Sequence, residues 1–162
     1  IRDAEGRIIP TLYAGTTFNC AAMETVYHDV PYSGQLKTCD QSKFAGHQHS
    51  TIKGLASLRL VDLTGLSLRK LGVSRSQLID TEKDRYPDTR LWAQAIHTQA
   101  PDAQGLRWVS RQDDTAMAFM LFGDRIASNS ILHQGSSRDL LDNPQAYEDL
   151  LTLAEQIGVL VV

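Results

Sequence analysis

Glu24 and His28 stand four residues apart in a run of helix-forming residues that follows a short apolar stretch containing Tyr13. The pattern predicts a strand over Pro10–Ala14 and, after a turn, a helix over Asn19–His28. Residues i and i+4 share one face of a helix, so the carboxylate and the imidazole would lie together. A fixed carboxylate can stabilise a developing positive charge, and an imidazole can bind an anion. The alternative is an ordinary polar pair on a solvated helix face.

A metal site is a second kind of chemistry to weigh. Cys39, His47 and His49 lie close together in the sequence with His28 upstream, and cysteine and histidine are zinc ligands. Their C-x7-H-x-H spacing is not that of a common zinc finger, so we expect no bound metal. The other cysteine is Cys20, and we expect both thiols to be reduced and buried rather than joined in a disulfide. Reduced cysteines are typical of the cytoplasm.

The elements that would position these residues form an α+β pattern, in which we expect antiparallel strand pairing. Strands are expected over residues 57–63, 106–110, 116–122 and 159–162. Helices are expected over residues 66–71, 86–97 and 144–158. The apolar run 116–122 would also fit a buried helical segment. Residues 29–50 are rich in turn formers, and we expect an exposed loop there that acts as a flap or a partner contact.

Length and charge restrict the classes of function. A chain of 162 residues is long enough for one domain with a hydrophobic core. The formal net charge of −3 disfavours unaided binding to nucleic acid or to an anionic membrane surface. No stretch approaches the length of about eighteen apolar residues that a membrane-spanning helix needs.

Three blocks of the sequence resemble the RES domain, a family named for an arginine, a glutamate and a serine. The first block is the Leu-Tyr-Ala-Gly strand with Tyr13, followed by the Glu-Thr-x-x-His segment that begins at Glu24. The second is Trp-Ala-x-Ala-Ile-His at residues 92–97, and the third is Gly-Leu-Arg-Trp-Val-Ser-Arg at residues 105–111. The blocks occur in the order that the family shows, and the resemblance extends from about residue 8 to residue 126.

The resemblance implies a single domain over residues 1–162 with a fold similar to that of ADP-ribosyltransferases, a mixed β-sheet with flanking helices. It implies an enzyme that takes NAD as its substrate and cleaves the nicotinamide–ribose bond. Some members use inorganic phosphate as the acceptor and are NAD phosphorylases, which deplete the NAD of the cell. At least one lineage instead transfers ADP-ribose to a protein. We expect phosphorolysis in preference to ADP-ribosylation of a protein, because nothing in the sequence identifies the acceptor.

Members of this family are usually toxins of bacterial toxin–antitoxin pairs. A helix-turn-helix antitoxin of the Xre type neutralises them. The resemblance therefore implies a cytoplasmic bacterial toxin with such a protein partner, in a homo- or hetero-oligomer.

The resemblance also implies roles for five residues. Glu24 and Ser110 are the expected catalytic residues, with Glu24 stabilising an oxocarbenium-like charge on the ribose and Ser110 donating to a carboxamide or phosphate oxygen. Tyr13 is expected to stack on nicotinamide or ribose, His28 to bind phosphate, and Arg111 to pair with the pyrophosphate. A core aromatic, a helix-terminal histidine and a surface arginine are the respective alternatives.

One departure from the family concerns its arginines. The family has one on an early strand and another in a Gly-Arg-Phe-like segment just ahead of the Leu-Tyr-Ala-Gly strand. Here Arg2 and Arg7 are the arginines that precede Tyr13, in a stretch whose glycine and proline predict a turn or loop. We therefore expect the chain to lack its first strand or strands and its site to be incomplete. A partner-binding module without activity is the alternative.

Overall fold

The computed structural model describes residues 1–31, 34, 36–81 and 85–162, with helices and strands interleaved along the chain. The strands are β1 (Thr11–Gly15), β2 (Lys37–Cys39), β3 (Gln48–Gly54), β4 (Leu60–Asp62), β5 (Gly105–Val109), β6 (Met117–Phe122), β7 (Ile131–Asp139) and β8 (Val159–Val161). The helices are α1 (Phe18–Met23), α2 (Gly65–Leu71), α3 (Arg75–Leu78), α4 (Tyr86–Gln99) and α5 (Pro144–Gln156). Short 3₁₀ helices cover Gln41–Phe44 and Gly123–Arg125.

The main sheet has four strands in the order β1-β6-β5-β4. β6 pairs antiparallel with β1 and β5, whereas β4 pairs parallel with β5. Two smaller sheets join β3 to β7 antiparallel and β2 to β8 parallel. The fold is α+β with a mixed sheet flanked by helices, as the sequence predicts, but the pairing is less uniformly antiparallel than expected.

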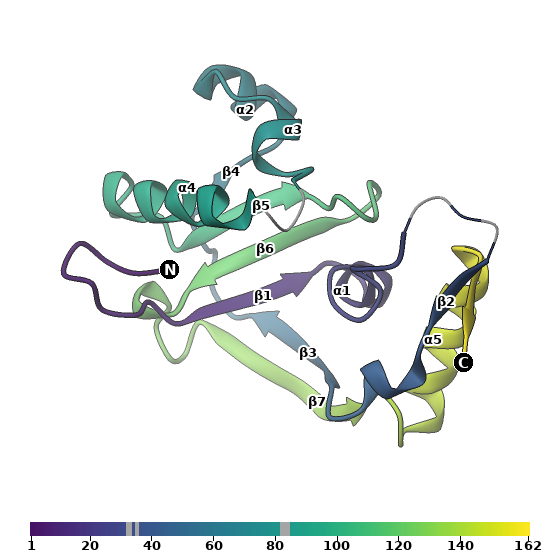
Figure 1. The fold of residues 1–162 in the computed structure, drawn as a ribbon. Coiled ribbons are helices and arrows are strands. Elements are labelled where there is room, and N and C mark those ends of the chain that lie inside the picture. The colour runs from purple at the N-terminus through teal and green to yellow at the C-terminus, as the bar shows by residue number, and fades with distance from the viewer. Residues whose placement is uncertain (32–33, 35, 82–84) are drawn as a thin grey trace.

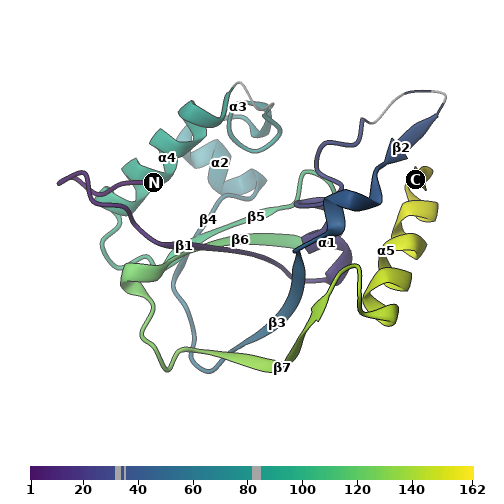
Figure 2. The same cartoon turned by 60° about the horizontal axis from the view of Figure 1, so that its bottom comes forward.

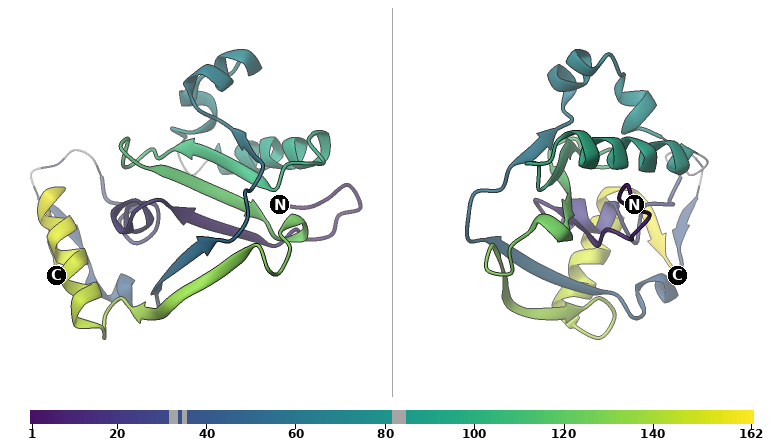
Figure 3. Two further views of the ribbon diagram at one scale, coloured as in Figure 1. Left: turned by 180° about the vertical axis from the view of Figure 1, so that it is seen from behind. Right: turned by 90° about the vertical axis from the view of Figure 1, so that its left-hand side faces the viewer.

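The layers place helices on one face of the main sheet and the β3–β7 ribbon on the other (Figures 1 and 2). α2, α3 and α4 lie above the sheet in the second view, and β3 and β7 lie below it. α1 follows β1 at the end of the sheet, and α5 stands beyond it with β2 (Figure 1). The view from behind shows the same arrangement (Figure 3). No described helix combines the length and the hydropathy needed to cross a bilayer.

Two clusters of buried side chains form the main cores on either side of α1. One lies between the main sheet and the helices above it, where Ala93 of α4 packs with Leu106, Met120 and Phe122 of the sheet. The other surrounds α5 and contains Tyr27, whose hydroxyl donates a 2.9 Å hydrogen bond to the Leu150 carbonyl. α1 contributes buried side chains to the α5 core and to a small cluster against β6, so it links the two halves of the chain.

Most of the strands and helices expected from the sequence are present. The strand around Tyr13 is β1, residues 116–122 form β6 rather than a helix, and Gly72 ends α2 with a φ of 70°. The expected strand over residues 57–63 is shorter, and a further short helix, α3, covers Arg75–Leu78. The expectation of a loop over residues 29–50 is wrong in part, because β2, a 3₁₀ helix and the start of β3 lie there; residues 32, 33 and 35 fall outside the described chain.

Gly105 is required by the close approach of β5 to β6. A Cβ atom at this buried position would clash with the Met120 carbonyl oxygen and lie 3.0 Å from the Cα of Leu121. We expect Gly105→Ala to lower the free energy of unfolding by about 1–3 kcal/mol, the usual range for overpacking, measured by urea denaturation. Gly65→Ala is the matched control, since a Cβ there meets nothing within 4 Å. Equal urea midpoints for the two variants would contradict this reading.

His49 ties β3 to β7 and α5. Its Nδ1 atom lies 3.1 Å from a guanidinium nitrogen of Arg138, which also pairs with Asp149 at 3.1 Å, while its ring meets Phe18 edge-on at 5.0 Å. Nδ1 can only accept from Arg138 when the imidazole is neutral. Burial lowers the pKa of His49 below its usual 6.5, the Arg138 cation lowers it further, and Asp149 opposes both.

A lowered pKa in the folded state means that folding favours the neutral imidazole. The resulting stability is present above pH 6.5 and is lost as the pH falls below this value. We expect the urea concentration at the unfolding midpoint to be lower at about pH 5.5 than at about pH 7.5. The difference should be smaller in His49→Gln, because glutamine does not titrate. His47→Gln, at an exposed neighbouring histidine, should keep the wild-type pH dependence. An identical pH dependence in both variants would contradict the role of His49.

Candidate active site

The side chains of Ser110 and Glu24 meet although 86 residues separate them in the sequence. Ser110 directly follows β5 and is fully buried, and its hydroxyl donates a 2.5 Å hydrogen bond to Oε1 of Glu24. Glu24 is the C-cap residue of α1, which is positioned by the strand–turn–helix connection from β1. The two residues expected to be catalytic are therefore brought together, on elements anchored in the main sheet.

Ser110 orients Glu24 and is not poised as a nucleophile. Its oxygen accepts hydrogen bonds from the backbone N–H groups of Gln112 and Asp113, each at 3.1 Å, in addition to donating to Glu24. One donor and two acceptor positions are all that a serine hydroxyl has, so all are in use. Within the described chain Oε2 of Glu24 has no hydrogen-bond partner, and because the side chain is partly exposed this oxygen is accessible.

Cys20 lies beside this pair, and its thiol is not activated as a nucleophile. It is fully buried, and burial raises the pKa of its thiol; the Glu24 and Asp113 carboxylates raise it further, while the nearby Ser110 hydroxyl acts in the opposite sense. A raised pKa leaves little thiolate, the nucleophilic form. Both cysteines are buried and free, as expected from the sequence.

His28 does not lie on the same helical face as Glu24, and that expectation was wrong. α1 ends at Met23, and His28 belongs to the turns beyond it. Its Nδ1 lies 3.0 Å from Asp29, and its Nε2 lies 3.1 Å from the hydroxyl of Tyr86 at the start of α4. Its carbonyl accepts a 3.4 Å hydrogen bond from the Gln112 side chain, which ties it to the segment after Ser110. His28 therefore joins α4 to the site.

α1 is shorter than expected because the residues that follow it turn toward the core around α5. The Thr25 hydroxyl donates back to the Ala21 carbonyl at 2.7 Å, a contact that competes with regular helix geometry. Tyr27 turns inward and is fully buried against Phe44. At the start of α1 the Thr17 side chain accepts a hydrogen bond from the backbone N–H of Cys20.

Tyr13 lies on β1 opposite Met120, and its side chain is 66% exposed. Partial burial raises the pKa of its phenol, and the Arg90 guanidinium acts in the opposite sense, so Arg90 lies within electrostatic reach of the ring. Tyr13 is thus an exposed aromatic surface and not the core residue of the alternative reading.

Arg111 and Arg75 hold the segments that flank Ser110. Arg111 donates to the Thr81 carbonyl, and Arg75 donates to the Ser110 carbonyl at 2.9 Å while pairing with Asp80 at 3.0 Å. These contacts fasten α3 and the residues up to Thr81 to the end of β5. Arg111, expected to bind pyrophosphate, is thus engaged with the backbone in this structure.

The arginines near the N-terminus are exposed and form contacts within their own segment. Arg7 pairs with Asp3 at 2.6 Å and with Glu5 at 3.0 Å, in an exposed turn closed by a bridge between Arg2 and Ile8. The prediction of a turn or loop here is confirmed. As for the zinc hypothesis, no three histidine, cysteine, aspartate or glutamate side chains gather as metal ligands among the described residues.

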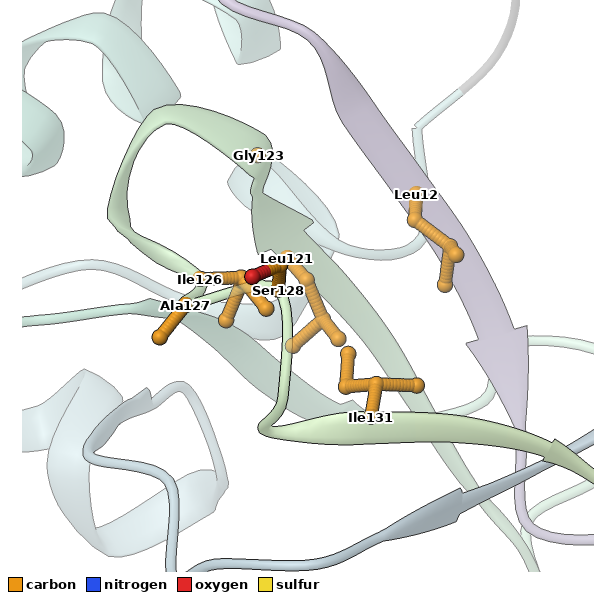
Figure 4. A pocket seen from close by; sticks show the side chains of 7 residues that line it. All are labelled: Leu12, Leu121, Gly123, Ile126, Ala127, Ser128 and Ile131. Atoms are coloured by element: carbon orange, nitrogen blue, oxygen red, sulfur yellow. The ribbon is translucent and has the colours of Figure 1, made fainter.

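An apolar hollow of about 210 Å³ lies on the opposite face of the main sheet (Figure 4). Leu12 lines it, and successive strand residues point to opposite faces, so the hollow and Tyr13 lie on different sides of β1. The lining residues are Leu12, Leu121, Gly123, Ile126, Ala127, Ser128 and Ile131. With no charged side chain, this hollow does not suit a phosphate-bearing ligand.

Sequence reasoning did not identify Tyr86 and Arg75 as residues of the site. It named Cys20 as a buried thiol but did not place it next to Glu24. Tyr86 is the first residue of α4 and precedes a proline. In the sequence this pattern indicates only that a helix begins there. Its contact with His28 spans 58 residues, and the contact of Arg75 with Ser110 spans 35. Neither could be read from local periodicity.

The Ser110–Glu24 hydrogen bond should be measurable as an interaction free energy. Ser110→Ala leaves two backbone N–H groups without their acceptor, and we expect a loss of about 1–3 kcal/mol in unfolding free energy. In a double-mutant cycle with Glu24→Gln, we expect coupling of about 0.5–3 kcal/mol by urea denaturation. Strictly additive effects would show that the two side chains do not interact in solution.

Comparison with known proteins shows to which family the chain belongs. The family model described as the RES domain matches residues 4–141, a range that contains β1, α1, α4 and β5 together with Glu24 and Ser110. No curated protein and no solved structure matches the chain significantly. Because the matched range covers most of the sequence, the chain belongs to the RES-domain family.

Proposed function

We propose that this protein degrades NAD by cleaving the bond between nicotinamide and ribose, with inorganic phosphate as the acceptor. The observation that carries the proposal is the Glu24 carboxylate, held by the buried Ser110 hydroxyl through one oxygen and unbonded at the other within the described residues. A fixed carboxylate with one available oxygen is suited to stabilising positive charge next to it. Membership of the RES-domain family supports an NAD-related reaction.

The reaction begins with loss of neutral nicotinamide. The bond between C1′ of the ribose and the ring nitrogen breaks, the nitrogen takes the electron pair, and positive charge develops on C1′ and the ring oxygen. Glu24 stabilises this oxocarbenium-like charge, as carboxylates do in glycoside hydrolysis. A phosphate oxygen then forms a bond to C1′, giving ADP-ribose 1″-phosphate and releasing a proton if the attacking phosphate was protonated.

The remaining residues support binding in this proposal. The exposed ring of Tyr13 offers a stacking surface for nicotinamide or ribose. His28 acts by holding Tyr86 and the start of α4 next to Glu24, because both of its ring nitrogens are engaged by Asp29 and Tyr86. Arg111 secures the segment before α4 through the Thr81 carbonyl.

The same family membership supports a proposal for the biological setting. We propose that the protein is a cytoplasmic toxin, inhibited by a helix-turn-helix antitoxin of the Xre type. Depletion of NAD would be the cause of toxicity, so a variant without the reaction should be tolerated by the cell.

Glu24→Gln tests the reaction directly. We expect NAD consumption by the wild-type protein to depend on inorganic phosphate, and the variant to lose about 10²–10³ in rate, the usual effect of deleting one electrostatic contact in a transition state. Glu148→Gln, at an exposed carboxylate on α5, is the matched control and should keep the wild-type rate. Product analysis should detect nicotinamide and a phosphorylated ADP-ribose in equal amounts.

Other outcomes would assign a different activity. NAD loss that requires Glu24 but not phosphate would indicate hydrolysis or transfer to a protein. No NAD loss by folded wild-type protein would contradict the proposal and favour a partner-binding module.

A further inference from the structure

α1 and α4 lie on the same face of the main sheet. Tyr13 and Gly15 point to the face that carries Met120 and Ala118, because residues directly opposite in an antiparallel pair share a face. A Cβ on Gly15 would lie 2.8 Å from the sulfur of Cys20, so α1 sits against this face. α4 packs on Met120 through Ala93, and Figure 2 shows it on the face away from β7.

Arg90 lies on the β1 side of α4, one helical turn after Tyr86. Tyr86 is fixed by its 3.1 Å contact with His28, and residues i and i+4 share a helix face. Gln94, a further turn along, donates a 2.9 Å hydrogen bond to the Arg2 carbonyl in the segment that leads into β1. Arg90 therefore lies between two contacts along α4. The contact of Tyr86 with His28 is directed toward the turns after Glu24, and the contact of Gln94 with Arg2 is directed toward β1, where Tyr13 lies.

The guanidinium of Arg90 is exposed and forms no hydrogen bond or ion pair with the described residues. Two other arginines around the site already form contacts within the protein. Arg75 pairs with Asp80 and donates to the Ser110 carbonyl, and Arg111 donates to the Thr81 carbonyl. Arg85, five residues before Arg90, pairs with Asp88 at 3.0 Å. A cation left available near the exposed Tyr13 ring, on the helix whose first residue contacts His28 in the turns after Glu24, is suited to binding a nucleotide phosphate.

We propose that Arg90 binds the pyrophosphate of the dinucleotide, with the ring of Tyr13 beside it and the Asp29–His28–Tyr86 chain setting the position of α4. This inference rests on NAD being the substrate. A guanidinium forms paired N–H···O bonds with phosphate oxygens, so Arg90 would select substrates that carry a pyrophosphate over those that lack one. Arg90 is thus a specificity residue, and Glu24 remains the residue that acts on the ribose.

Kinetics with two substrates tests this role. NAD carries a pyrophosphate, whereas nicotinamide riboside has the same scissile bond and no phosphate. We expect Arg90→Gln to lower the ratio of kcat/KM for NAD to kcat/KM for nicotinamide riboside by about tenfold, mainly through KM for NAD, as expected for loss of one charge-assisted hydrogen bond. Arg90→Lys should recover part of the ratio. Arg69→Gln, at an exposed arginine in the last turn of α2, is the charge-matched control and should leave the ratio unchanged.

Equilibrium binding separates failure of this inference from failure of the proposed reaction. If the wild-type protein does not consume NAD, binding of ADP-ribose can still be measured by calorimetry. Binding that is about tenfold weaker in Arg90→Gln than in Arg69→Gln would support the pyrophosphate contact without turnover. Equal affinities in the two variants, equal kinetic ratios, or no binding of ADP-ribose by folded wild-type protein would overturn it.

Discussion

The buried hydrogen bond from Ser110 to Glu24 is the contact on which the arrangement of the site depends. It joins the end of β5 to the end of α1, and it uses a hydroxyl whose remaining positions are filled by two backbone N–H groups. A buried hydroxyl with all its partners in place holds a single orientation, since breaking any one bond leaves a polar group unsatisfied. Glu24 thus has a fixed position without being enclosed, as electrostatic stabilisation of a transient charge requires.

Several contacts keep the two sides of this hydrogen bond together. α1 packs into the cluster around α5 and also against Gly15 and β6, so it cannot move without disturbing both. On the other side, Arg75 and Arg111 tie α3 and Thr81 to the residues around Ser110. His28 then links the turn after Glu24 to α4. The site therefore lies where four segments meet, with most of its polar groups used to hold those segments in place.

The sequence predicts the elements with a strong local signal and misses those without one. β6 is apolar throughout, and α2 is followed by Gly72, so both are predicted close to their observed bounds. β3 and β7 were not predicted because their residues are mostly exposed and carry no apolar alternation. Backbone pairing along this ribbon and contacts such as that of Arg138 with His49 stabilise it, and neither leaves a periodic pattern in the sequence.

The sequence by itself determined the residue types of the site, the strand–turn–helix unit that presents Glu24, and the strand end that presents Ser110. It also carried the resemblance to the RES domain. Only the tertiary structure decided that α1 stops at Met23, that His28 contacts Tyr86 and not Glu24, and that Arg111 binds a backbone carbonyl while Arg90 does not. The physical reason is the separation along the chain over which each effect acts. Periodicity and capping act over a few residues, whereas these contacts join segments tens of residues apart and form only when both cores pack.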